Sequence, residues 1–423
     1  MPLPLVRAAQ LACLVLALAA CASRPTSSAP SAPATLLLIS VDGLRADYLG
    51  RGQTPYLDAL GREGVQAEWM NPSYPSLTFP NHYTLVTGLR PDHHGIVGNT
   101  IGDDTLGRFM PSDSQAVGDG RWWGGEPIWV AAEKAGLRTA TLFWPGSEAA
   151  VQGVRPSQWR KYDKAFPIEQ RVGQVERWLD LPAAQRPRLI TLYFDQVDAA
   201  GHDHGPQSED VAQRLREVDA AIGELREHLR TQGTTQAVNI IVVSDHGMAA
   251  TALDRMVAIE ALVPAEIADT INSGQVVGFV PKPGRVQEAE QRLLGRHGAV
   301  ECWRKQDMPA RWHYGAHPRI APIVCQADEG WLIERQSKID NRRAEQWRGG
   351  GAHGYDPALP SMRAVFMAVG PAFRQHARLP AFDNVDVYPL LARLLGVPAA
   401  ANDGELRNLQ PALAPPAIDV RKQ

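Results

Sequence analysis

The chain has 423 residues, of which 44% are hydrophobic and 21% charged, and its formal net charge is -3. This length and composition are those of a globular protein with a large core and room for a further subdomain. A protein that binds nucleic-acid polymers normally carries a basic surface, so the slightly acidic balance argues against that class.

The N-terminal segment has the pattern of an export signal. Arg7 precedes the apolar run 11–20, which is too short to span a bilayer comfortably. The run ends in Leu-Ala-Ala-Cys at residues 18–21, which resembles a bacterial lipobox and predicts a lipid anchor on Cys21. An ordinary signal peptide cut after Ala22 is the alternative. We predict an exported, periplasmic protein, with residues 1–21 as signal and lipobox and residues 22–34 as a flexible tether.

Export determines how the cysteines are interpreted. Cys13 lies in the signal and Cys21 is the anchor candidate, so Cys302 and Cys325 remain. In an oxidising compartment two remaining thiols more often pair than stay free, which predicts a Cys302–Cys325 disulfide. Two buried thiols are the alternative.

From Thr35 onward apolar strands alternate with helical segments, which predicts an α/β fold with a mostly parallel central sheet and helices on both faces. Near-continuous apolar runs are typical of buried parallel strands. Strands are expected over residues 35–41, 188–194, 237–243 and 363–369, and helices over 54–63, 127–135, 209–230 and 385–395.

Residues 256–343 have a different pattern, with irregular chain rich in Trp and Pro. Strands are expected over 275–280 and 330–334 and a helix over 286–296. We predict a small inserted α/β cap that divides the catalytic core into residues 35–255 and 344–423. Such a cap closes over a site or serves packing alone, and the sequence leaves both open.

Three short polar clusters, together with one further acidic residue, supply seven side chains that commonly bind metals. They are Asp198 and His202, Asp245 and His246, His353 and Asp356, and the separate Asp42. Several of them follow predicted strands, and the carboxyl ends of parallel strands form the ligand-binding edge of an α/β sheet. Oxygen and imidazole donors without thiolate suit Zn²⁺ in an open, catalytic site. Seven donors are too many for one tetrahedral ion, so the set predicts two metals and phosphoryl-transfer chemistry.

Each cluster by itself has a simpler interpretation. Asp198 and His202 share one face if their segment is helical, but nearby glycines favour a tight turn equally, and a surface pair is common. Asp245 is also consistent with a helix cap beside a packed His246, and His353 with a surface loop. The prediction of one site therefore depends on the convergence of the clusters.

Thr78 is the candidate nucleophile. It lies just before a helix that is expected to begin at Pro80 or Asn81, and a helix N-terminus stabilises anions. The alternative is that Ser76 and Thr78 only cap this helix. Asn99, after Gly98, is placed to donate to a phosphate oxygen or, alternatively, to make a turn.

These motifs carry a family resemblance that extends from residue 42 to residue 356. The chain resembles a bacterial member of the nucleotide pyrophosphatase/phosphodiesterase family, within the alkaline phosphatase superfamily, and so implies an alkaline-phosphatase-like fold. The motifs are Ser40-Val-Asp-Gly43, Leu77-Thr-Phe-Pro-Asn-His82, Asp198-x-x-x-His202 with Gly205-Pro206, Ser244-Asp-His-Gly-Met248 and His353-Gly-Tyr-Asp356. Many animal relatives have a lysine where this chain has Leu77, which affects a phosphate-side contact but not the metal chemistry.

The resemblance implies two Zn²⁺ per chain and a covalent phospho-threonine intermediate on Thr78. Asn99 would steady the phosphate, and Phe79 and Tyr162 would stack on a nucleobase. The metal ligands would be Asp198, His202 and His353 for one ion and Asp42, Thr78, Asp245 and His246 for the other.

The expected activity is hydrolysis of nucleotide phosphodiester or pyrophosphate bonds with release of nucleoside 5′-monophosphates. The alternatives are a choline-headgroup phospholipid phosphodiesterase with the same metal core, a phosphomonoesterase, and a non-catalytic envelope lipoprotein. A sulfatase is disfavoured because no Cys/Ser-x-Pro-x-Arg motif occurs.

Overall fold

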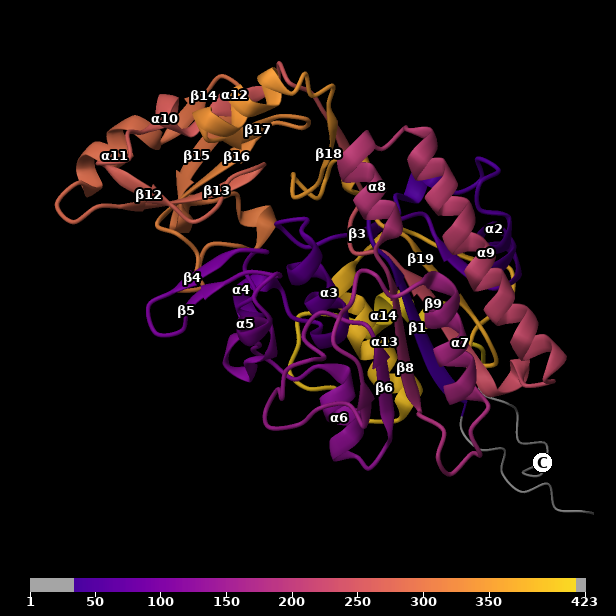
Figure 1. Ribbon diagram of the computed structural model, residues 1–423. Helices are drawn as coiled ribbons and strands as arrows, with labels where there is room; N and C mark the ends of the chain where they lie inside the picture. The colour runs from indigo at the N-terminus through magenta and orange to yellow at the C-terminus, as the bar shows by residue number, and fades with distance from the viewer. Residues whose placement is uncertain (1–33, 416–423) are drawn as a thin grey trace, which may run out of the picture. The chain divides into compact units, whose positions relative to one another are not determined.

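The centre of the fold is an eight-stranded sheet in the order β20-β2-β19-β9-β1-β8-β6-β7 (Figure 1). The computed structural model describes residues 34–415, and the structural statements below concern these residues. The pairings are parallel except those of β19, which is antiparallel to both neighbours. The strands are β1 (Thr35–Val41), β2 (Val65–Ala67), β6 (Thr139–Leu142), β7 (Gln158–Trp159), β8 (Leu189–Phe194), β9 (Val238–Val243), β19 (Phe366–Val369) and β20 (Ala377–Leu379).

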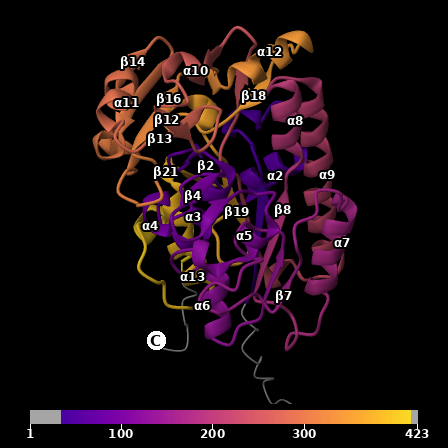
Figure 2. The same ribbon diagram turned by 60° about the vertical axis from the view of Figure 1, so that its left-hand side comes forward.

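Helices cover both faces of this sheet, as expected from its apolar strands (Figure 2). Leu36 and Leu38 of β1 pack in one apolar cluster and Leu37 and Ile39 in another, because successive side chains of a strand point to opposite faces. The first cluster includes α3 (Thr78–Thr87), α6 (Ile128–Lys134) and α13 (Val387–Leu395); the second includes α2 (Pro55–Glu63), α7 (Ile168–Leu179), α8 (Gln196–His204) and α9 (Glu209–Thr231).

A second, antiparallel sheet lies within the segment predicted as a cap. Its order is β12-β13-β16-β15-β14, and α10 and α11 contribute to its own apolar cluster. The elements are β12 (Ala268–Thr270), β13 (Val276–Pro281), β14 (Gly295–His297), β15 (Val300–Arg304), β16 (Ile323–Ala327), α10 (Ile259–Leu262) and α11 (Val286–Leu293). The boundaries of the cap as a domain stay a prediction.

The remaining helices and strands are short. They are α4 (Pro91–His94), α5 (Ser114–Gly118), α12 (Gln336–Ala344) and α14 (Leu406–Leu409), with the strand pairs β21 (Phe382–Asp383) and β3 (Met70–Asn71), β4 (Ile101–Asp103) and β5 (Gly107–Phe109), β10 (Ala249–Thr251) and β18 (Gly350–Ala352), and β11 (Met256–Ala258) and β17 (Leu332–Glu334).

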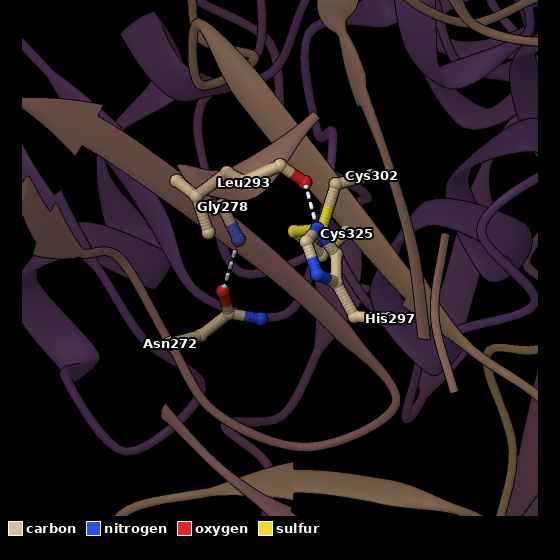
Figure 3. The surroundings of a disulfide bond; sticks show 6 residues. All are labelled: Asn272, Gly278, Leu293, His297, Cys302 and Cys325. Atoms are coloured by element: carbon tan, nitrogen blue, oxygen red, sulfur yellow. Dashed lines mark hydrogen bonds between the residues drawn. A yellow bond between two sulfur atoms is a disulfide. The ribbon is translucent and has the colours of Figure 1, made fainter. Parts of the chain in front are cut away.

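The predicted disulfide is present in the second sheet. Cys302 of β15 lies directly opposite Cys325 of β16, and both side chains are buried (Figure 3). Figure 3 also shows His297 donating to the carbonyl of Leu293, a contact that ties the end of α11 to the neighbouring β14.

Several expected element ends were wrong; the strand expected over 363–369, for example, begins only at Phe366. The helix that carries Thr78 begins at Thr78 itself rather than at Pro80, because proline is accepted throughout the first helical turn. The helix expected over 286–296 ends at Leu293, and Gly295, with a φ of 96°, starts a strand instead.

Residues 1–33 lie outside the described residues, and so do the predicted signal, the lipobox and most of the tether. Within residues 34–415 no helix has the length and apolar character needed to cross a membrane.

Candidate active site

The acidic clusters meet at one edge of the central sheet. β1 pairs in parallel with β8 and β9, so the three strands end together. Asp42 directly follows β1, α8 begins two residues after β8, and Asp245 and His246 follow β9. This carboxyl edge is where α/β sheets bind ligands, and segments more than 200 residues apart are joined there.

Asp198, His202 and His353 form the first group of donor atoms. Asp198 and His202 lie four positions apart on α8, which is helical and not a tight turn. His353 directly follows β18, whose pairing with β10 places it beside the segment after β9. Its Nε2 lies 3.0 Å from His202 Nε2 and 3.5 Å from Asp198 Oδ1. The three side chains are close enough to hold one metal ion.

Asp42, Asp245, His246 and Thr78 form the second group. His246 Nε2 lies 2.9 Å from Asp245 Oδ2 and 3.5 Å from Asp42 Oδ1. Thr78 Oγ1 lies 3.2 Å from the same nitrogen. The rings of His246 and His353 stack with centroids 3.5 Å apart, so the two groups adjoin.

The three histidines are oriented in the same way. Nδ1 of each lies 2.9 Å from a backbone carbonyl, that of Gly351 for His202, Gly247 for His246 and Ser76 for His353. A carbonyl only accepts, so Nδ1 carries the proton and Nε2 offers its lone pair to the site. Protein ligands of metals are commonly fixed in this way. Nε2 lone pairs that face each other, as in His202 and His353, need a cation.

The carboxylates lead to the same conclusion. One oxygen each of Asp42, Asp198 and Asp245 is buried without a hydrogen-bond partner among the described residues. Burial, then the charges of Asp245 and Asp198, raise the pKa of Asp42 well above its usual value. Burial, then the proximity of His246 and His202, lowers the pKa of His353. Divalent cations would relieve both penalties, so these oxygen and nitrogen donors fit a pair of metal ions such as Zn²⁺.

Thr78 and Asn99 lie beside these donors. Thr78 is the first residue of α3, and the first N–H groups of a helix have no partner within the helix. One of them, the N–H of Phe79, donates to Asn99 Oδ1 at 3.0 Å. This bond fixes the amide so that its NH₂ group is the end available to a bound anion.

A cavity of about 400 Å³ opens over the donors. Its walls include Thr78 and Asn99 together with both predicted stacking residues, Phe79 and Tyr162. Phe79 packs edge-on against Phe109, with ring centroids 5.6 Å apart. The cavity is therefore aromatic on part of its wall and polar at the metal donors, as small-molecule sites usually are.

Two side chains next to the donors were not predicted. Tyr193 donates from its hydroxyl to Asp42 Oδ2 at 2.6 Å. His82 Nδ1 lies 2.9 Å from the carbonyl of Thr78, and its Nε2 lies 2.8 Å from Ser40 Oγ. His82 also lies with Asp42 and Asp245 in a group of side chains close enough to share a metal, but both of its ring nitrogens already have these polar partners. The sequence signals were a tyrosine in a buried, mostly apolar strand and a histidine inside a motif.

Asp356, one of the predicted metal donors, lies outside the site. Asp356 pairs with Arg311 of the inserted segment and accepts from the N–H of Ala358. It belongs to none of the groups of donors that can share a metal. The glycine before Tyr355 turns the chain away after His353, with a φ of 101°.

Comparison with known proteins agrees with this geometry. The family model described as type I phosphodiesterase / nucleotide pyrophosphatase matches residues 36–356. An uncharacterised pyrophosphatase/phosphodiesterase of Schizosaccharomyces pombe is 37% identical over 389 residues, which are 89% of this chain and 80% of the relative. Ectonucleotide pyrophosphatase/phosphodiesterase family member 3 of Bos taurus is 36% identical, over 90% of this chain and 44% of the relative. A venom phosphodiesterase of Crotalus durissus collilineatus is 35% identical, over 94% and 48%.

The fold has solved counterparts. Murine ectonucleotide pyrophosphatase/phosphodiesterase 5, an inactive threonine-to-alanine variant in complex with AMP, superposes with a TM-score of 0.84 at 33% identity and covers 90% of this chain and all of that one. The chain spans about half the length of the vertebrate member 3 and venom relatives. It belongs to the type I phosphodiesterase / nucleotide pyrophosphatase family and is a phosphoric diester hydrolase.

Proposed function

We propose that this protein hydrolyses phosphodiester or pyrophosphate bonds of nucleotides and releases nucleoside 5′-monophosphates. The observation that carries the proposal is the position of Thr78 Oγ1, at a helix N-terminus and 3.2 Å from His246 Nε2, beside an aromatic-walled cavity. The murine relative that binds AMP supports a nucleotide as the substrate class.

Two zinc ions per chain are part of the proposal. Asp198, His202 and His353 would hold one; Asp42, Asp245, His246 and Thr78 would hold the other. When bound, the ions supply positive charge that lowers the pKa of the threonine hydroxyl and offsets the charge of the phosphate. The unpartnered carboxylate oxygens support this assignment.

The protein's own residues then perform a double displacement. The Thr78 hydroxyl gives up its proton, and its Oγ forms a bond to phosphorus as the bond to the leaving oxygen breaks; the leaving oxygen takes up a proton, and a phospho-threonine results. A water oxygen next bonds to phosphorus, the Thr78 oxygen leaves and recovers its proton, and the nucleoside monophosphate departs. The Asn99 amide and the N-terminus of α3 stabilise the non-bridging oxygens. Phe79 and Tyr162 contact the base, and stacking of this kind contributes about 1–3 kcal/mol per base.

Thr78→Ala tests the mechanism. We expect the turnover of the nitrophenyl ester of thymidine 5′-monophosphate to fall by about 10³-fold or more, because the nucleophile is gone while the other donors remain. Zinc content, measured by elemental analysis, should stay near the wild-type value, and Thr78→Ser should restore part of the activity. Full activity in Thr78→Ala would contradict the mechanism.

Two further expectations complete the proposal. We propose that a lipid on Cys21 holds an exported, bacterial protein at the envelope membrane, which mass spectrometry of the mature N-terminus would test. We also propose residues 256–343 as the cap between two parts of the catalytic core. The choline-headgroup alternative would be favoured if lysophosphatidylcholine were cleaved faster than ATP.

A further inference from the structure

Tyr162 is held in place although it lies in irregular chain. It stands between β7 and α7, and its side chain is 40% exposed on the wall of the cavity. Its hydroxyl nevertheless donates to Asp195 Oδ2 at 2.9 Å, and its backbone N–H donates to Glu148 Oε1 at 2.8 Å. The ring lies edge-on to Phe143, with centroids 5.4 Å apart. The aromatic plane is therefore fixed from several sides.

Asp195 is itself fixed by a buried ion pair. Its Oδ1 accepts from Arg171 Nη1 at 2.8 Å, so one carboxylate oxygen binds Arg171 and the other binds Tyr162. The Arg171 side chain is fully buried in α7, and its Nη1 also donates to the carbonyl of Tyr193. A buried charged pair is weak evidence for stability, because removing both charges from water is costly, so a role in specifying geometry is the better explanation.

The guanidinium of Arg171 also holds the loop that carries Tyr162. Arg171 Nε donates to the carbonyl of Phe166 at 3.0 Å, and Phe166 lies four residues after Tyr162. Arg171 therefore fixes both the end of the loop and the acceptor of the tyrosine hydroxyl. Asp195 also directly precedes α8, which carries Asp198 and His202, so the network joins the aromatic wall to the metal donors.

We propose that the Arg171–Asp195 pair is a positioning device that holds the Tyr162 ring in the orientation that receives the base of a nucleotide. Asp195 is thus a positioning residue for substrates with a base and has no role in the displacement at phosphorus. This inference rests on the proposed function. A ring that is already ordered loses little side-chain entropy when the base binds, so the network raises affinity for nucleotides through preorganisation.

Tyr162→Phe is the decisive variant, since it removes one hydroxyl and keeps the ring. Substitution of Asp195 would leave Arg171 unpaired in the interior and endanger the fold. Two esters are compared: the nitrophenyl ester of thymidine 5′-monophosphate and methyl nitrophenyl phosphate, which has no base. We expect KM for the thymidine ester to rise about three- to tenfold with kcat nearly unchanged, and both constants for the methyl ester to stay at wild-type values. Tyr388→Phe is the matched control, because Tyr388 accepts a hydrogen bond from Ala400 and does not line the cavity.

Unchanged KM for the thymidine ester, or an equal loss on both esters, would overturn the positioning role. Failure of the proposed function would be visible separately, as wild-type protein that cleaves neither ester. In that case calorimetric titration still decides: weaker binding of AMP to Tyr162→Phe with unchanged binding of orthophosphate supports the inference, and equal AMP affinity overturns it.

Discussion

At the residue scale, the site is defined by which atoms of each side chain already have a hydrogen-bond partner in the protein and which remain free for a ligand. Nδ1 of His202, His246 and His353 is used by a backbone carbonyl, so only Nε2 remains for a ligand. The hydroxyl of Tyr193 occupies one oxygen of Asp42 and leaves the other without a partner. These local bonds orient the donors before any metal binds, which reduces the ordering needed at binding.

His94 predicts a pH dependence of stability outside the site. The ring is buried, the N–H of Ile96 donates to its Nδ1, and its Nε2 lies 3.1 Å from Thr84 Oγ1. Burial lowers its pKa to about 3. Below its unfolded pKa of roughly 6.5, the unfolded chain binds a proton that the folded chain does not. The contribution of His94 to stability is therefore complete above this pH and is lost as the pH falls toward 3.

The measurement is urea unfolding of metal-free protein at several pH values. The wild type should lose about 1.4 kcal/mol more per pH unit below pH 6 than His94→Asn, whose side chain does not titrate. His376→Asn, at an exposed position, should keep the wild-type slope. Parallel slopes for wild type and His94→Asn would show that His94 is protonated in the folded state.

At the element scale, the inserted segment is anchored on both loops that lead to the reacting groups. Trp312 stacks on Tyr74, with ring centroids 4.1 Å apart, and Tyr74 also donates to Gln326. Tyr74 lies four residues before Thr78. The hydroxyl of Tyr314 donates to the carbonyl of Val97, two residues before Asn99. The segment therefore buttresses the nucleophile and amide loops.

Trp312→Ala tests this buttress. Loss of a buried tryptophan should lower the free energy of unfolding by about 3–5 kcal/mol. If the stack positions Thr78, kcat should also fall by about tenfold with normal zinc content, since displacement of a reacting group is costly. Trp303→Ala, which removes an edge-on neighbour of Trp312, is the matched control and should keep kcat. A loss of stability with unchanged kcat would mean that the segment serves packing alone.

At the scale of the whole molecule, the metal donors join segments that are otherwise distant in the chain. Asp42, Asp198, Asp245 and His353 come from four such segments, and three of these residues are carboxylates that repel one another in the interior. Bound cations would convert this repulsion into attraction between the segments. If the proposed metals bind there, the site is expected to stabilise the fold as well as to serve catalysis.

Removal of the metals should consequently destabilise the protein. We expect the protein after extraction with a chelator to have a free energy of unfolding at least about 3 kcal/mol lower than that of the same protein saturated with zinc. Re-addition of Zn²⁺ should restore the original value. Differential scanning calorimetry would show this as a lower Tm. The control is His204→Ala, because His204 is the last residue of α8 and belongs to none of the donor groups; this variant should respond to the chelator as the wild type does. An identical Tm with and without chelator would contradict a structural contribution of the metals.

Local signals allowed four strands of the central sheet, β1, β8, β9 and β19, to be predicted, together with most of the donor residues that the structure brings together. The run 35–41 became β1 without change, since a long apolar run fits only a buried strand here. Element ends were less certain because turns and caps depend on single residues. The helix expected to reach residue 296 stopped at Leu293 for this reason.

The sequence by itself determined the kinds of donor atom, because the chemistry of carboxylate, imidazole and hydroxyl groups is a property of each residue. It also determined the sheet that gathers them, because apolar runs are read locally. Only the tertiary structure decided which residues are neighbours. Asp356 lies outside the site and pairs with Arg311, whereas Tyr193 contacts Asp42 and the Arg171–Asp195 pair lies beside the donors. Such contacts depend on strand register and on loops that meet in space. The residues they join are 24 positions apart for Arg171 and Asp195 and 202 positions apart for Gly43 and Asp245, so no local pattern encodes them.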